Sequence, residues 1–338
     1  MGAENDAFTA FSFISFAVVL IPLPWHLEVW NTGTCLYMLW TATGCFILFI
    51  DSIIWDGSTE NWAPLWCDIS TRLIIGVSVA IPAASLCINR RLYTIARVRT
   101  VTTTWADRRR AILIDLSIGL GIPIIVMILQ YVVQGHRFDI FEDLGCRTFI
   151  YNTPLAYPLV FVPPVVLGMI SAVFSALTIR AFSLRHAEFK QFMNSNNMVT
   201  FNRYIRLMVL AALDILLTVP FTAYIVYSNL TQGKVAPWIS WEDTHSGFSR
   251  IDHFPAALWK KNPAAHVSLE LSRWGVVISA LLFFALFGFA DEAMKNYRKA
   301  YGHVASRLGV TVKSASSSSF RGTPGSSSNG YVHSLSVA

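Results

Sequence analysis

Two aspartates inside apolar stretches, Asp115 and Asp214, are the first candidates for chemistry. A pair of aspartates within a membrane could cleave peptide bonds, but neither lies in a Gly-x-Gly-Asp or Tyr-Asp context. The sequence contains no His-Glu-x-x-His motif of a zinc protease and no glycine-rich phosphate loop. Residues 267–290 hold no lysine that could form a retinal Schiff base. We therefore predict a protein that is not an enzyme and that has neither a cofactor nor a metal site.

Asp214 lies in the apolar stretch 207–230, which is long enough as a helix to cross the hydrocarbon core of a bilayer. An acid at that depth is costly unless it faces a protein interior or water. Pro220 removes a backbone hydrogen bond and bends the helix. Two interpretations remain open: a packing kink with a hydrogen-bonded acid, or a switch helix that swings about Pro220 on ligand binding. At helical spacing, the face of Asp214 also carries Leu217, Thr218, Phe221, Ile225 and Ser228.

The composition indicates an integral membrane protein. Only 14% of the 338 residues are charged and 54% are hydrophobic, whereas a soluble domain carries about 25% charged residues. The fold class that we predict is an all-α bundle of seven transmembrane helices. Its spans are residues 7–24, 33–55, 70–88, 111–134, 155–179, 206–230 and 267–290.

The distribution of basic residues predicts the orientation. With the N-terminus outside the cell, the inner segments hold 18 of the lysines and arginines and the outer segments hold 6. This bias favours an outer N-terminus and a cytoplasmic C-terminal segment. Because these residues lie in short loops between spans, they indicate membrane topology and no nucleic-acid partner. We predict a multi-pass protein of the plasma membrane.

Two segments follow the seventh span. Residues 290–308 show apolar positions at helical spacing, which predicts a short amphipathic helix on the inner leaflet of the bilayer. The serine-rich stretch that follows is expected to be disordered. We therefore divide the chain into a seven-span membrane domain, residues 1–301, and a cytoplasmic tail, residues 302–338.

Two cysteines, Cys67 and Cys146, fall on the outer, oxidising side in this topology. We predict a disulfide between them that ties the third span to the second outer loop. Cys35, Cys45 and Cys87 fall inside spans and are expected to be small buried residues.

Charged residues near the two membrane faces suggest different roles. At the inner face, Arg90, Arg91, Arg203 and Arg206 either anchor the protein to anionic lipid or dock a partner. At the outer face, Glu270 and Arg273 lie three residues apart, and Arg72 enters the third span at similar depth. Because an unpaired buried charge is costly, we expect one arginine to pair with Glu270 and the other to be free for a ligand.

The longest outer loop, residues 229–266, is rich in aromatic and apolar residues, including Trp238, Trp241 and Trp259. An apolar surface of this size is unfavourable in water, so we expect it to be buried against another surface. Three placements remain open: the loop lies on the outer leaflet, it caps the other outer loops, or it covers the bundle opening and contacts a ligand.

Several ordered motifs resemble one family, the fungal lipopeptide mating-pheromone receptors of the a-factor type, which are class D G-protein-coupled receptors. The similarity extends over about residues 5–305. It is carried by residues 22–26 (PLPWH), 31–34 (NTGT), 210–214 (LAALD) with Pro220, 270–274 (ELSRW), 283–290 (FFALFGFA) and 297–298 (YR). Near the position of the Asp-Arg-Tyr motif of animal rhodopsin-like receptors this chain has Asn89-Arg90-Arg91.

The resemblance implies a receptor that binds a farnesylated, methyl-esterified peptide pheromone and activates a heterotrimeric G protein. Arg90, Arg91, Arg203 and Arg206 would then contact the G protein, and Asp214 and Pro220 would form the switch in the sixth span. A seven-helix transporter and a non-signalling membrane protein are the alternatives. The expected ligand-binding residues are Arg72, Arg147, Tyr151, Tyr224, Tyr227, Trp238, Trp241, His245, Glu270 and Arg273.

Overall fold

The computed structural model describes residues 2–97, 104–184, 198–232, 234–289 and 294. In this part of the chain seven helical segments are long and apolar enough to cross a membrane. They are Glu4–Glu28, Thr32–Ile54, Pro64–Arg97, Trp105–Val133, Tyr157–Ala181, Ile205–Thr231 and Pro263–Phe287. The seven membrane-length helices are confirmed and the chain is mostly helical, but the predicted all-α class is wrong in one respect, because the segments between the helices also form three short strands. The expected amphipathic helix and the tail lie outside the described residues, apart from Met294.

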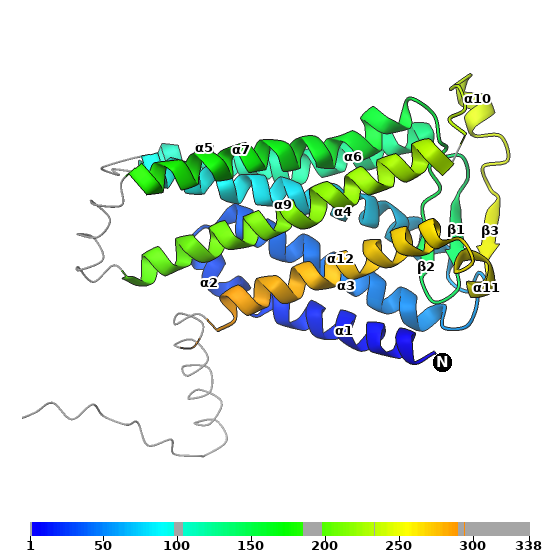
Figure 1. Ribbon diagram of the computed structural model, residues 1–338, viewed down its shortest axis with the longest axis horizontal. Coiled ribbons are helices and arrows are strands. Elements are labelled where there is room, and N and C mark those ends of the chain that lie inside the picture. Colours follow the sequence, from blue (N-terminus) through cyan, green and yellow to red (C-terminus); the bar gives the residue numbers. More distant parts are fainter. Residues whose placement is uncertain (1, 98–103, 185–197, 233, 290–293, 295–338) are drawn as a thin grey trace, which may run out of the picture. The chain divides into compact units, whose positions relative to one another are not determined.

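The long helices run back and forth between the two ends of the bundle (Figure 1). The bundle consists of α1 (Ala3–Leu20), α2 (Leu23–Glu28), α3 (Thr32–Ile54), α4 (Pro64–Arg97), α5 (Trp105–Leu116), η1 (Ser117–Gly121), α6 (Ile122–Gln130), η2 (Tyr131–Val133), η3 (Tyr157–Phe161), α7 (Val162–Leu184), α9 (Met198–Gln232) and α12 (Pro263–Phe287). At one end lie β1 (Phe138–Phe141), β2 (Gly145–Arg147), α10 (Trp241–Thr244), β3 (Ile251–Phe254) and α11 (Ala256–Trp259). We call the end that carries β1–β3 the sheet end and the opposite end the α2 end.

Helix α4 lies at the centre of the bundle and packs against α3, α6, α7 and α9. Its buried residues are mostly small, including Gly76, Ala80, Ala83 and Ala84, which lets neighbouring backbones come close. On the facing helix α3, a Cβ on Gly33 would lie only 2.9 Å from the Cβ of Cys87. Close helix packing therefore explains why these positions hold small side chains.

The first span ends differently from the prediction. Pro22 and Pro24 lie at the end of the first predicted span, residues 7–24, where a proline is expected to end a helix. Helix α1 does end at Leu20, but α2 begins at Leu23, because a proline in the first turn of a helix needs no hydrogen-bond partner for its nitrogen. His26 of α2 is buried, and its ring centroid lies 5.5 Å from that of Phe287. The motif around the two prolines thus packs α2 against the end of α12.

The fourth span is interrupted by η1, a π-helical turn between α5 and α6. Pro123 follows this turn and has no N–H to donate to the preceding turn of helix. The indole nitrogen of Trp40 on α3 donates to the carbonyl oxygen of Gly119 at 3.0 Å. A side chain of a neighbouring span therefore satisfies a backbone acceptor in the irregular turn.

A three-stranded sheet in the order β2-β1-β3 covers the sheet end. Strands β1 and β2 are antiparallel, whereas β3, from the long loop 229–266, pairs parallel to β1. Cys67 and Cys146 form a disulfide with Cα atoms 5.4 Å apart, the pairing that the sequence analysis expects. These two residues form a buried cluster with Trp55, Phe138 and Ile140. The sheet is thereby attached to the start of α4 and the end of α3.

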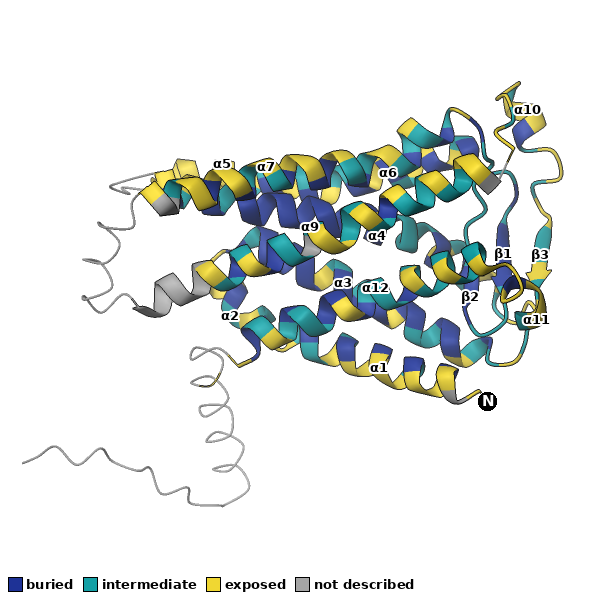
Figure 2. Cartoon of the chain, viewed as in Figure 1, coloured by how far each residue is buried: buried dark blue, intermediate teal, exposed yellow. Residues whose placement is uncertain are grey.

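The outward faces of the bundle helices are exposed and apolar (Figure 2). Examples are Phe13 on α1, Ile128 on α6 and Val173 on α7. Large exposed apolar side chains on several neighbouring helices are the pattern of a surface in contact with lipid.

Candidate ligand-binding site

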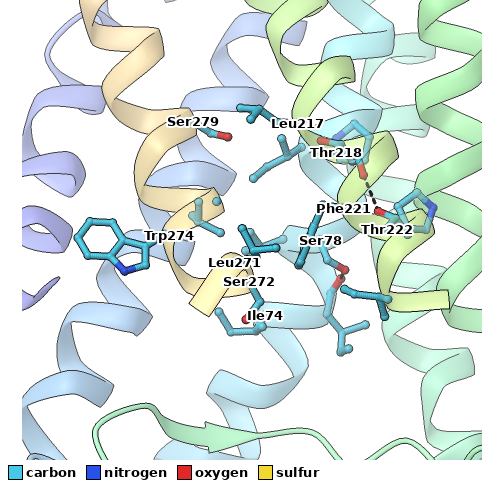
Figure 3. A pocket seen from close by; sticks show the side chains of 18 of the residues that line it. Ile74, Ser78, Leu217, Thr218, Phe221, Thr222, Leu271, Ser272, Trp274 and Ser279 are labelled. Carbon is cyan, nitrogen blue, oxygen red and sulfur yellow. Dashed lines mark hydrogen bonds between the residues drawn. The ribbon is translucent and has the colours of Figure 1, made fainter. Parts of the chain in front are cut away.

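A mostly apolar cavity of about 330 Å³ lies inside the bundle, between α4, α9 and α12 (Figure 3). Ligand pockets in proteins typically measure about 300–1,000 Å³, so the space suits a small apolar group. The hydroxyl of Thr222 donates to the carbonyl oxygen of Thr218 in its own helix at 2.8 Å. Because this hydroxyl is bonded within its own helix, it adds little polarity to the surface of the cavity. Its labelled lining residues are Ile74, Ser78, Leu217, Thr218, Phe221, Thr222, Leu271, Ser272, Trp274 and Ser279.

The cavity exists because α9 and α12 pack tightly only toward the α2 end. There, Leu207 and Leu210 of α9 join one buried cluster with Phe283 and Phe287 of α12. Nearer the sheet end, α12 presents small residues, and a Cβ added at Gly275 would meet no atom within 4 Å. The small side chains of α12 therefore leave room that large ones fill further along the same helix.

The end of the cavity toward β2 is polar, because Arg147 lines it. The Nε and Nη2 atoms of Arg147 are buried and have no hydrogen-bond partner among the described residues. Burial lowers the pKa of the Arg147 guanidinium, and the nearby charge of Asp51 opposes that shift. One oxygen of Asp51, Oδ1, accepts from the indole of Trp66 at 2.7 Å, while Oδ2 is buried without a partner. Unsatisfied buried donors and acceptors are costly, so this end of the cavity suits a polar ligand group.

We expected one of the two outer-face arginines to pair with Glu270 and the other to be free. The pairing is correct, but the remaining arginine is not free. Arg273 binds both carboxylate oxygens of Glu270, at 2.9 and 2.7 Å. Arg72, however, is not free, because it donates to the side-chain oxygens of Gln130 and Gln134. Neutral glutamines satisfy this arginine, and a search for acidic partners overlooks them.

Of the ten expected ligand-binding residues, all of which the structure describes, Arg147 alone lines the cavity. Tyr224 and Tyr227 lie on α9 outside the lining, with Tyr227 exposed. The backbone N–H of Tyr151 donates to the carbonyl oxygen of Val133 at 2.8 Å, beyond β2. The expected set is thus spread over the sheet end rather than gathered at one pocket.

The aromatic residues of the long loop form a second cluster over η2. The ring of Trp241 stacks on His245 with centroids 4.1 Å apart, and His245 Nε2 lies 2.9 Å from the carbonyl oxygen of Tyr131. Trp238 and Trp241 are both exposed. Because β3 pairs with β1 later in the same loop, the loop packs on the other segments of the sheet end. This is the arrangement expected of a cap.

Charged residues hold this cap to the bundle. His136 Nε2 lies 2.6 Å from Asp139 Oδ1, and Arg250 binds both Asp252 (3.1 Å) and His136 (3.2 Å). Burial raises the pKa of Asp139, and the hydrogen bond from His136 opposes the shift. His136, Asp139 and Asp252 lie close enough together to hold a metal ion, but Arg250 already bonds to two of the three, Asp252 and His136. We interpret the cluster as a salt-bridge network between β1 and β3.

At the α2 end, two of the predicted partner-binding arginines make contacts within the protein. Arg90 Nη2 lies 2.7 Å from Oδ1 of the buried Asp115, and Arg91 Nη1 donates to the carbonyl oxygen of Trp30 at 2.6 Å. Arg206 is half-buried on α9, and the side chain of Arg203 is outside the described residues. The same holds for the side chain of Asp214, whereas Pro220 lies within α9 as predicted.

Comparison with known proteins decides the family. Residues 7–307 match the sequence profile of the family described as Pheromone A receptor. The chain belongs to this family. It is 44% identical over 308 residues to the Pheromone B alpha 3 receptor of Schizophyllum commune, covering 91% of this chain and 49% of that protein. It is 35% identical to Pheromone receptor 1 of Mycosarcoma maydis (86% and 82% covered) and 26% identical to the Pheromone a factor receptor of Saccharomyces cerevisiae (84% and 59% covered).

Membership of the pheromone A receptor family confirms the resemblance seen in the sequence motifs and bears out the expectation of a receptor rather than an enzyme. The chain thus belongs to a receptor family of the plasma membrane and has seven helices long and apolar enough to cross that membrane. It spans about half the length of its Schizophyllum commune relatives.

Sequence reasoning found part of the cavity of this pheromone-family receptor and missed the rest. Four of the five residues assigned to the face of Asp214 line it, namely Leu217, Thr218, Phe221 and Ile225. The α12 side was missed, although its small residues Ser272, Gly275 and Ser279 recur every three or four positions in an apolar helix. That spacing is a signal that could have indicated the second wall.

Proposed function

We propose that this protein is the receptor for an extracellular farnesylated peptide mating pheromone and that it activates a heterotrimeric G protein. The observation that carries the proposal is the apolar cavity with a polar end inside a member of the pheromone A receptor family. Transfer of a hydrocarbon tail from water into such a space lowers its free energy. The peptide part of the ligand requires polar contacts where it joins the tail. The cavity offers both.

The test is a reporter assay in yeast cells that lack their own pheromone receptor. A panel of synthetic peptides, each with and without a farnesyl group, should include prenylated members that activate the reporter only in cells expressing this chain. The unprenylated forms should require a much higher dose. Failure of every lipopeptide in cells with normal surface expression would contradict the proposal.

We propose further that the sheet end faces the outside of the cell and the α2 end faces the cytoplasm. The excess of lysine and arginine in the segments at the α2 end and the disulfide at the sheet end both support this orientation. An epitope tag fused before residue 1 should be detected by antibody on intact cells, and a tag fused after residue 338 only after permeabilisation. The opposite pattern would overturn the orientation.

In this orientation the cytoplasmic face would receive the G protein at Arg90, Arg91, Arg203 and Arg206, whose charge attracts an acidic partner surface. Replacing all four with glutamine should lower G-protein activation while ligand binding and surface expression persist.

The switch at Asp214 and Pro220 would transmit ligand binding to this cytoplasmic face. Residues 1–301 would form the receptor domain, so a chain that ends there should keep ligand binding.

A further inference from the structure

The unpartnered nitrogens of Arg147 lie on one edge of its guanidinium group. Nε–H and the adjacent N–H of Nη2 point in parallel, so together they form a fork that can bind one or two oxygen atoms. Both nitrogens are buried, neither has a partner among the described residues, and Arg147 lines the cavity. A buried charged donor without an acceptor is costly. In this conformation both nitrogens have almost no exposed surface, so the guanidinium must turn about its terminal torsions to face the cavity that Arg147 lines, where a ligand can bring the missing acceptor.

The charges around Arg147 favour a neutral acceptor. Asp51, Glu270 and Arg273 all act on Arg147 through space, which gives two acidic and two basic side chains in one region. Arg273 is already bound to Glu270, and the Asp51 carboxyl lies near Arg147 without a hydrogen bond to it, so an acidic ligand group would be placed beside another acid. A free carboxylate would add an uncompensated charge at the end of an apolar space. An ester or amide carbonyl accepts the same hydrogen bonds without that cost.

We propose that Arg147 anchors the polar end of the ligand by donating hydrogen bonds to a neutral carbonyl group, while the apolar chain of the same lipidated residue fills the cavity between α4, α9 and α12. This assignment rests on the proposed function and names the chemistry of its ligand. Arg147 is then a specificity-determining residue that distinguishes lipids with a carbonyl at this point from plain hydrocarbon chains.

The test measures binding directly, using full-length receptor in lipid nanodiscs and three probes: N-acetyl-S-farnesylcysteine methyl ester, its free acid, and farnesyl methyl sulfide, which lacks both the ester and the acetamide carbonyl. The ester should bind the wild-type receptor at least about 10-fold more tightly than the sulfide, as expected for a hydrogen bond to a charged group. The free acid should bind more weakly than the ester. Arg147→Lys keeps the charge but loses the fork, and it should remove most of the difference between ester and sulfide.

Two further variants separate the cavity from the anchor. Gly275→Leu fills the space where a Cβ has no neighbour within 4 Å, so it should abolish binding of all three probes. Gly121→Leu is its control, because Gly121 also has open space but does not line the cavity. Arg137→Lys controls for Arg147→Lys, since Arg137 binds Asp68 away from the cavity. Thermal unfolding without probe checks that each variant is folded.

Equal binding of ester and sulfide, tighter binding of the free acid, or an unchanged ester preference in Arg147→Lys would overturn the anchor. If Gly275→Leu binds the probes as the wild type does, the cavity is not the lipid site. If no probe binds but the lipopeptide panel activates the reporter, this inference fails and the proposed function stands. If neither binding nor activation is seen, both fail.

Discussion

Arg90 of α4 and Asp115 of α5 form an ion pair at the α2 end, with Nη2 and Oδ1 2.7 Å apart. The carboxylate is almost completely buried and the guanidinium is only a quarter exposed. The pair joins two helices that are consecutive spans of the bundle. It also occupies an arginine that we propose for G-protein contact, so release of this pair would be one way to present Arg90 to a partner.

The first prediction tests this ion pair. Asp115→Asn and Arg90→Gln should each lower the thermal unfolding midpoint, because each leaves a poorly solvated partner behind. The double variant should lose less stability than the two single variants lose together. The difference, their coupling free energy, should be about 1–3 kcal/mol. Asp115→Asn should also raise reporter activity without pheromone if the pair restrains Arg90. Additive effects and unchanged basal activity together would show that the pair is not coupled.

The second prediction concerns Glu270 and Arg273, which are three residues apart on α12 and doubly hydrogen-bonded. Reversal of either charge should reduce surface expression, since both side chains are mostly buried. Reversing both together should restore part of the loss. Rescue stays incomplete, because Arg273 also lies 4.4 Å from the ring centroid of Phe8, where a carboxylate would be repelled.

The matched control pairs Glu270→Arg with Arg72→Glu, since Arg72 is held by two glutamines instead. Rescue by that combination, or no rescue by the Glu270 and Arg273 reversal, would contradict the pairing in the structure.

The third prediction concerns the disulfide between Cys67 and Cys146. Peptide mapping without reduction should recover the two cysteines joined. Cys67→Ser, Cys146→Ser and the double variant should lower stability by the same amount, about 2–5 kcal/mol, because each removes the same bond. Cys45→Ser, at a buried free cysteine of α3, is the control for loss of a cysteine alone. Free alkylation of both thiols in native protein would refute the bond.

The helices of this receptor could be predicted from sequence because their signal is local and strong. An apolar run of about 20 residues bounded by charges defines a span without knowledge of its neighbours. The end at Pro22 and Pro24 was harder, because a proline stops one helix and can equally well start the next. Only the packing of His26 against Phe287 decides in favour of α2.

Contacts between distant segments could not be predicted in this way. The parallel pairing of Phe138 with Ile251 joins residues from different loops, and neither loop has a sequence feature that identifies the other. Arg72 shows the same limit, since its glutamine partners carry no charge to mark them. Helical spacing from Asp214 identified residues of one wall of the cavity. The residues of the opposing wall could not be identified in this way, because they depend on where α12 packs. The polar end at Arg147 depends on a strand whose position is set by the disulfide.

The last prediction concerns Trp238 and Trp241 in the long loop at the sheet end. Both are exposed, and Trp241 rests on His245 and Tyr131 rather than in the cavity. Exposed aromatic rings at the proposed outer face suit a peptide with a lipid tail, because they bind both apolar and polar groups. We expect Trp238→Ala with Trp241→Ala to raise the pheromone dose needed for half-maximal response several-fold, at unchanged surface expression.

Two single variants provide controls for this pair. Trp259 is buried in α11, so Trp259→Ala should lower expression and thermal stability together, as expected for loss of a cap residue. Trp62 is exposed on the loop between α3 and α4, and Trp62→Ala should leave both dose and expression unchanged. If the double variant behaves like Trp259→Ala, the two tryptophans stabilise the cap. A double variant that behaves like Trp62→Ala would exclude contact between these tryptophans and the ligand, because the pheromone would then bind and signal at its normal dose without them.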